Sequence, residues 1–270
     1  MPSFNEISAP QLMRQLGSAD APILVDVCID DDFAEDPRLI PSSRRLPFDR
    51  ILEVLTEVDG RRVVVICQKG KKRSHGAASL LRCESVHAEV LTGGILAWRD
   101  ANLPLVPVEV MPEIARGKTL WVTRHRPKID RIACPWLIRR FVDPGARFLF
   151  VPPSEVTSVA GKFHAIPFDI EGVFWSHRED RCSFDTMVDV FKLSHPALDR
   201  LATVVRAADT DRHELAPQAA GLLALSVGLS RLHKEDQAQL SAALPMYDAL
   251  FRWARDGFEE GHDWPAGATK

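Results

Sequence analysis

Residues 63–82 read Val-Val-Val-Ile-Cys-Gln-Lys-Gly-Lys-Lys-Arg-Ser-His-Gly-Ala-Ala-Ser-Leu-Leu-Arg. The unbroken β-branched run that opens this stretch predicts a strand covered on both faces of a parallel sheet. The run from Ala77 to Leu81 is rich in good helix formers and predicts a helix. Cys67 therefore lies in a loop between a buried strand and a helix.

The residues around this stretch continue the alternation of strands and helices. Apolar residues at helical spacing predict a helix over 7–16, and short apolar runs predict strands over 23–27 and 88–91. Gly93-Gly94 precedes a further helical segment, Ile95-Leu96-Ala97-Trp98. The predicted fold of the first half is α/β, an open parallel sheet flanked by helices, with its active loop at the carboxyl end of a strand.

A proline-rich stretch, Leu-Pro-Leu-Val-Pro-Val-Glu-Val-Met-Pro over 103–112, predicts an extended connection between two domains. We place the first domain at 1–108, a linker at 109–118 and the second domain at 119–270. In the second domain we expect strands at 119–123 and 147–151, and helices at 135–141, 201–208, 216–232 and 236–256. It is therefore predicted to be α+β with a largely helical end.

Composition limits the partners of the protein. A chain of 270 residues with a formal net charge of −3 has no overall field that would recruit nucleic acid or an anionic membrane. The start of the chain lacks the features of a signal peptide, and no run approaches the length of a membrane span. We expect a cytoplasmic protein that binds neither membrane nor nucleic acid. Its five cysteines have no C-x-x-C spacing, so neither a disulfide framework nor a zinc ribbon is indicated.

The loop after Cys67 is suited to holding negative charge. Four of the six residues that follow the cysteine are cationic, which favours the thiolate form of its side chain. A thiolate there can attack a sulfane sulfur donor, carry the sulfur as a persulfide and pass it to a thiol or to cyanide, with no cofactor. The predicted nucleophile is Cys67, and the residues predicted to cradle the anion are Gln68, Lys69, Gly70, Lys71, Lys72 and Arg73.

Together with Val-Leu-Thr-Gly-Gly-Ile-Leu-Ala-Trp-Arg-Asp-Ala-Asn-Leu-Pro-Leu, this loop resembles the single-domain rhodanese family over about residues 3–107. The resemblance implies that Cys67 is the persulfide carrier and that Asp26 helps to hold the fold. Two departures stand out. Cys28 replaces the arginine that usually follows the aspartate, and Arg38-Leu39-Ile40-Pro41-Ser42 replaces the usual Gly-His-Ile-Pro-Gly.

The length of the loop leaves other activities open. Counted to Arg73, it has the C-x5-R form that resembles dual-specificity phosphatases and arsenate reductases, whereas counted to Lys72 it has the shorter sulfurtransferase form. A third possibility is a module that senses an oxyanion or a redox change without turnover. Cys28 could face the loop and resolve a persulfide, although we favour a structural role for it.

The second half contains a basic stretch over 119–140, in which Asp130 is the single acid. Trp-Val-Thr-Arg-His-Arg-Pro-Lys-Ile-Asp-Arg-Ile-Ala-Cys-Pro-Trp, with Phe168-Asp169, Cys182-Ser183-Phe184-Asp185 and Arg206-Ala207-Ala208-Asp209, resembles the C-terminal domain of the chromate-resistance protein B family over about 119–256. The resemblance implies binding of chromate or a related oxyanion. The predicted oxyanion ligands are Arg124, Arg126 and Arg131.

Residues able to bind a metal are frequent further along this half. Histidine and carboxylate together suit iron, zinc or manganese. We expect His164, His177 and Asp209 as ligands, supported by Asp169 or Asp185.

Overall fold

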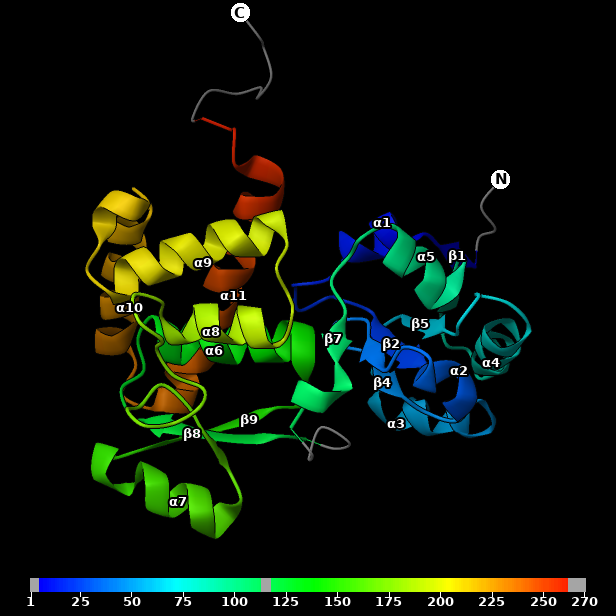
Figure 1. Ribbon diagram of the computed structural model, residues 1–270, viewed down its shortest axis with the longest axis horizontal. Coiled ribbons are helices and arrows are strands. Elements are labelled where there is room, and N and C mark those ends of the chain that lie inside the picture. Colours follow the sequence, from blue (N-terminus) through cyan, green and yellow to red (C-terminus); the bar gives the residue numbers. More distant parts are fainter. Residues whose placement is uncertain (1–4, 113–117, 262–270) are drawn as a thin grey trace, which may run out of the picture.

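The computed structural model describes residues 5–112 and 118–261. Figure 1 shows two halves side by side, the first built on a sheet and the second dominated by helices. Both predicted fold classes are confirmed. Among the described residues, no helix combines the length and the apolar character that crossing a membrane requires.

The first half is built on a five-stranded parallel sheet with the strand order β1-β6-β5-β2-β4. Its strands are β1 (Glu6–Ile7), β2 (Ile23–Asp26), β4 (Arg44–Arg45), β5 (Val63–Ile66) and β6 (Ala88–Leu91). Every residue of β2 and of β5 is buried, as expected for inner strands covered on both faces.

The alternation of side chains along the inner strands divides the core of this half between the two faces of the sheet. Leu24, Val64 and Ile66 point to the face that is covered by α1 (Ala9–Met13) and α5 (Gly94–Asp100). Val25, Val63 and Val65 point to the other face, which is covered mainly by α4 (Lys72–Cys83). The remaining short elements of this half are α2 (Asp30–Ala34), the 3-10 helix η1 (Phe48–Val54) and α3 (Leu55–Val58).

The first helix is shorter than the apolar spacing predicts. Ser8 caps it in a capping box with Gln11, so the helix begins only at Ala9. Glu6 and Ile7, which we expected near its start, instead pair with β6 as the edge strand β1. The spacing of apolar residues therefore identified a buried segment but not its change from strand to helix.

The connection between the halves is partly ordered. Strand β7 (Val106–Pro107) pairs antiparallel with β3 (Arg38–Leu39) and is followed by the short helix η2 (Val108–Val110). The proline-rich stretch is thus extended at Val106–Pro107, as its composition suggests, but turns into a short 3-10 helix directly after it. Residues 113–117 of the predicted linker lie outside the described residues.

The second half contains a three-stranded parallel sheet with the order β10-β8-β9. Its strands are β8 (Leu120–Arg124), β9 (Arg147–Val151) and β10 (Ile166–Pro167). Helix α7 (Val156–Phe163) packs on this sheet, below β8 and β9 in Figure 1. The remaining helices are α6 (Asp130–Leu137), α8 (Ser183–Val190), α9 (Pro196–Asp209), α10 (Ala219–Leu232) and α11 (Asp236–Arg252).

The two halves share one hydrophobic core. A single cluster of buried residues includes Leu12 and Trp98 from the first half and Trp136, Phe141 and Phe251 from the second. Figure 1 shows α11 passing behind α8 and α9, so this helix carries its aromatic residues through the middle of the second half. The halves are therefore packed together rather than only joined by a linker.

Candidate functional site

Cys67 lies at the carboxyl end of β5, the middle strand of the first sheet, and directly before the loop that leads into α4. Cys67 is only 5% exposed and belongs to the same hydrophobic cluster as Val65 and Cys28. The Cys67 Sγ lies 3.1 Å from the Oγ of the buried Ser74 in the first turn of α4. The sulfur is thus held at the amino-terminal end of a twelve-residue helix.

Two glycines fix the loop that follows Cys67. Gly70 and Gly94 have φ angles of 61° and 63°, in the left-handed region that favours glycine. A Cβ on Gly94 would collide with the carbonyl oxygen of Cys67, and one on Gly70 would collide with that of Leu91. The loop is tied to α5 by hydrogen bonds from Ile95 N to the Cys67 oxygen (3.1 Å) and from Leu96 N to the Gln68 oxygen (3.2 Å).

The cationic side chains that follow Cys67 do not surround its sulfur as the predicted cradle requires. The Arg73 guanidinium pairs with Asp32 at 3.0 Å, and the Gln68 amide donates to Glu35 at 3.0 Å. The predicted cradle residues Lys69, Lys71 and Lys72 are exposed, whereas Gly70 supports the loop through its backbone. Because Arg73 already has an acidic partner, the geometry gives no support to a C-x5-R site in which this arginine faces an oxyanion.

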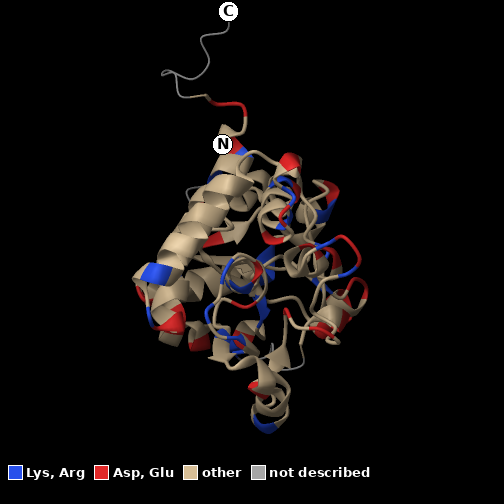
Figure 2. Ribbon diagram, turned by 90° about the vertical axis from the view of Figure 1, so that its left-hand side faces the viewer, with Lys and Arg blue, Asp and Glu red and all other residues tan. Residues whose placement is uncertain are grey.

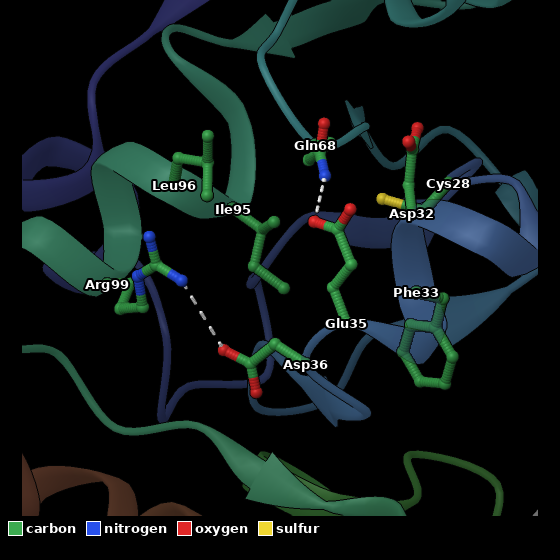
Figure 3. A pocket seen from close by; sticks show the side chains of 9 residues that line it. All are labelled: Cys28, Asp32, Phe33, Glu35, Asp36, Gln68, Ile95, Leu96 and Arg99. Atoms are coloured by element: carbon green, nitrogen blue, oxygen red, sulfur yellow. Dashed lines mark hydrogen bonds and ion pairs between the residues drawn. The ribbon is translucent and has the colours of Figure 1, made fainter.

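A small pocket lies beside the loop, and Figure 3 shows its lining. Glu35 points toward Gln68, and Arg99 points toward Asp36, with 3.9 Å between the charged groups of the latter pair. The residues that line the pocket are Cys28, Asp32, Phe33, Glu35, Asp36, Gln68, Ile95, Leu96 and Arg99. Of the three acids in the lining, Asp32 pairs with Arg73 and Asp36 pairs with Arg38, so most of the negative charge of the pocket is compensated by arginines.

Cys28 follows β2, the strand next to β5, and it lines this pocket. Burial, followed by the charge of Asp26, raises the pKa of the Cys28 thiol. Burial also raises the pKa of Asp26, and hydrogen bonds to Cys28 oppose that shift. Because a protonated thiol is a weak nucleophile, the surroundings of Cys28 fit the structural role favoured by the sequence.

A second group of polar residues lies in the second half, around His177. The His177 Nε2 lies 3.2 Å from an Asp209 oxygen, 3.4 Å from an Asp169 oxygen and 3.5 Å from an Asp130 oxygen. Asp130 is the first residue of α6 and Asp209 the last residue of α9, while Asp169 and His177 lie in the segment between β10 and α8. Three carboxylates therefore converge on one imidazole, two of them from helices distant from His177 in the sequence.

The ionisation of this group is strongly perturbed. Burial, followed by the charges of Asp209 and Asp169, raises the pKa of Asp130. Hydrogen bonds to Asp169 and Asp209 raise the pKa of His177 to about 10. Burial opposes ionisation of Asp169, but its hydrogen bonds with His177 and Ser183 and two nearby arginines lower the pKa of that carboxyl. Such perturbations are typical of functional sites.

Two of the three predicted oxyanion ligands reach this group. The Arg124 and Arg131 guanidinium groups lie 3.1 Å and 3.4 Å from the same Asp169 oxygen. Arg126 is engaged elsewhere, because its guanidinium donates to the carbonyl oxygens of Ser230 and His233 at the end of α10. Figure 2 shows positive and negative segments intermixed on the side of this half.

The structure brings together three of the five predicted metal ligands, Asp169, His177 and Asp209. His164 is an exposed residue at the end of α7 and is not part of the group. Asp185 is buried but accepts hydrogen bonds from Arg206 and from the Cys182 backbone N–H. Asp130 completes the group and was not among the predicted ligands; being the only acid in the basic stretch 119–140 was the signal that could have pointed to it.

The parallel sheet, the cysteine at the end of its middle strand and the glycine-supported loop define a rhodanese-type α/β domain. The model of the rhodanese-like domain matches residues 8–101, and the model described as ChrB, C-terminal domain matches residues 121–254. In its first half the chain belongs to the rhodanese-like family, and its second half is similar to the ChrB C-terminal domain.

Individual proteins are similar to parts of the chain. The chain is 29% identical over 195 residues to Protein ChrB of Cupriavidus metallidurans, covering 67% of this chain but only 59% of that protein. It is 30% identical over 106 residues to a sulfurtransferase of Allochromatium vinosum, covering 39% of this chain and 97% of that protein. A solved rhodanese-related protein of Thermoplasma volcanium is 25% identical, with a TM-score of 0.33, covering 38% of this chain and 98% of that chain.

Proposed function

We propose that this protein is a sulfurtransferase in which Cys67 carries sulfane sulfur as a persulfide. The observation that carries the proposal is the position of the Cys67 sulfur at the carboxyl end of the middle strand, against the first turn of α4. The side chain of the N-cap residue Lys71 makes no capping hydrogen bond, so backbone N–H groups of the first turn of α4 can stabilise negative charge. The persulfide would carry its charge at this end of the helix.

The reaction has two displacement steps. With thiosulfate as donor, the Cys67 thiolate attacks the outer sulfur, a sulfur–sulfur bond forms, and sulfite leaves with the electron pair of the broken bond. A thiolate or cyanide then attacks the outer sulfur of the persulfide, which restores the Cys67 thiolate. Because Cys67 is 5% exposed, a small donor and a small acceptor fit this site better than another folded protein.

Residues of the loop position the reacting sulfur rather than react themselves. The Ser74 hydroxyl donates to the Lys71 oxygen at 3.0 Å and lies against the Cys67 sulfur, so it connects the nucleophile to the start of α4. The exposed Lys69, Lys71 and Lys72 would draw an anionic donor toward the loop.

We also propose that sulfur transfer serves the response to chromate or a related oxyanion in the cytoplasm. This rests on the fusion of the rhodanese-like domain to a ChrB C-terminal domain. Arg124 and Arg131 are the residues proposed to meet such an anion, which would have to compete with Asp169 for both guanidinium groups.

The test is the mass of the intact protein after incubation with thiosulfate. We expect the mass of one sulfur atom on the wild type, removed by cyanide, and none on Cys67→Ser. Cys28→Ser is the matched control, since it alters the neighbouring buried cysteine, and it should still take up sulfur. A sulfur adduct on Cys67→Ser, or none on the wild type with several sulfane donors, would refute the proposal.

A further inference from the structure

The group around His177 places three carboxylates against one imidazole. The Asp130, Asp169 and Asp209 side chains are 1%, 6% and 19% exposed. Removing a carboxylate from water is costly unless its charge is compensated. Among the described residues, Arg124 and Arg131 pair with Asp169, but Asp130 and Asp209 have no ion pair except that with His177.

One carboxylate oxygen of the group around His177 lacks a hydrogen-bond partner among the described residues. Asp130 Oδ2 accepts hydrogen bonds from the backbone N–H groups of Ser183 (2.5 Å) and Phe184 (3.3 Å). Asp130 Oδ1 is fully buried and has no hydrogen-bond partner in the described part of the chain. Buried carboxylate oxygens are normally satisfied, so an unpartnered one indicates a missing ligand.

We propose that Asp130, His177 and Asp209 bind a divalent first-row transition metal ion. Their ligand atoms all lie within 4.8 Å of one another. Two atoms bonded to one ion at about 2.1 Å lie about 3.0–4.2 Å apart in tetrahedral or octahedral geometry. Small rotations of the side chains therefore suffice to close the three ligands on an ion.

The backbone supports these ligands as a metal site requires. Asp130 is held by the amino terminus of α8, and the Tyr247 hydroxyl donates to the carbonyl of the preceding Ile129. Asp209 ends the fourteen-residue helix α9. The His177 side chain is 41% exposed, which leaves the ion a path of entry and an open coordination position.

The ligand set restricts the metal. One imidazole with two carboxylates is a nitrogen and oxygen site, typical of zinc, iron or manganese rather than of copper(I). The nearby Cys182 thiol donates to Asp185 instead, and its pKa is raised by burial, so it is not expected to act as a thiolate ligand. Asp169, paired with the two arginines, would orient His177 from the side.

The test titrates Zn²⁺ and, separately, Mn²⁺ into the full chain after removal of bound metal with a chelator. We expect one equivalent of ion per chain. His177→Ala and Asp209→Asn should each weaken metal binding by about 100-fold or more, because loss of a metal ligand weakens binding at least as much as loss of a residue that hydrogen-bonds to a ligand. His164→Ala removes an exposed histidine outside the group and should bind like the wild type.

Two further measurements separate this site from the other half of the protein. Circular dichroism should show that both ligand variants remain folded, and Cys67→Ser should bind zinc like the wild type, which excludes capture by the loop thiol. Unchanged affinity in His177→Ala and Asp209→Asn, equal loss in His164→Ala, or no binding of either ion by the wild type would overturn the proposal. The persulfide test on Cys67 is independent of all these outcomes.

Discussion

Gly94→Ala tests the glycine contact that fixes the Cys67 loop. An alanine at this φ of 63° takes the left-handed conformation at about 1–2 kcal/mol. Its Cβ would also meet the carbonyl oxygens of Cys67 and Gln68 and the Gly70 nitrogen, all backbone atoms that cannot rotate away. Overpacking of this kind adds about 1–3 kcal/mol. We therefore expect the free energy of unfolding to fall by about 2–5 kcal/mol.

The assay is urea denaturation followed by far-ultraviolet circular dichroism and by tryptophan fluorescence, with sulfur uptake measured on the same samples. Gly76→Ala is the matched control, because Gly76 lies within α4 and a Cβ there meets nothing within 4 Å. That control should be stabilised by about 0.5–1 kcal/mol, since alanine is the better helix former. If Gly94→Ala unfolds at the same urea concentration as the wild type, the loop is not held as described.

Two further predictions concern buried polar groups. Asp185→Ala removes the acceptor of the Arg206 guanidinium and of the Cys182 N–H, so we expect the free energy of unfolding, measured by urea denaturation, to fall by about 3–5 kcal/mol. The control Asp189→Ala removes an exposed carboxylate and should lower it by less than about 1 kcal/mol. Equal effects of the two variants would contradict this prediction. Because the pKa of Cys28 is raised in the folded state, its contribution to stability is complete below the unfolded value of about 8.5 and is lost as the pH rises beyond it. The free energy of unfolding under reducing conditions should thus fall between about pH 8 and pH 10, and less steeply in Cys28→Ala; identical slopes would refute the assignment.

Much of the fold could be predicted because local patterns determine it. The run Val63–Ile66 became a fully buried inner strand, and Arg147–Val151 is the strand β9 that the sequence predicts. The ends of helices and strands were harder to predict, because capping interactions such as the capping box of Ser8 and Gln11 decide where a helix begins. The role of Arg73 could not be predicted either, since its partner Asp32 lies 41 residues away in the chain.

The proposed metal site around His177 shows why a set of ligands is difficult to predict from the sequence. His164 and Asp185 have the right chemistry, and Asp185 is even buried, yet a neighbouring arginine already satisfies its charge. Asp130 looks like an isolated acid in a basic stretch, but it begins α6 at the point where the amino terminus of α8 and the segment of His177 meet. Only the tertiary packing reveals that Asp130, like Asp209, has no ion pair other than that with His177 in the described part of the chain.

The packing of the two halves also fixes the position of the two proposed sites relative to each other. Gly17 lies so close to Phe141 and Phe251 that a Cβ there would collide with both rings. Nearby, the Ser42 N–H donates to the Phe141 oxygen at 2.7 Å. Domains that meet only through a flexible connection move independently, whereas halves with a common hydrophobic core are held in one arrangement. Helix α11 contributes Tyr247, which supports Asp130, and Phe251, which packs against the first half. A single helix therefore contacts both the proposed metal site and the rhodanese-like domain.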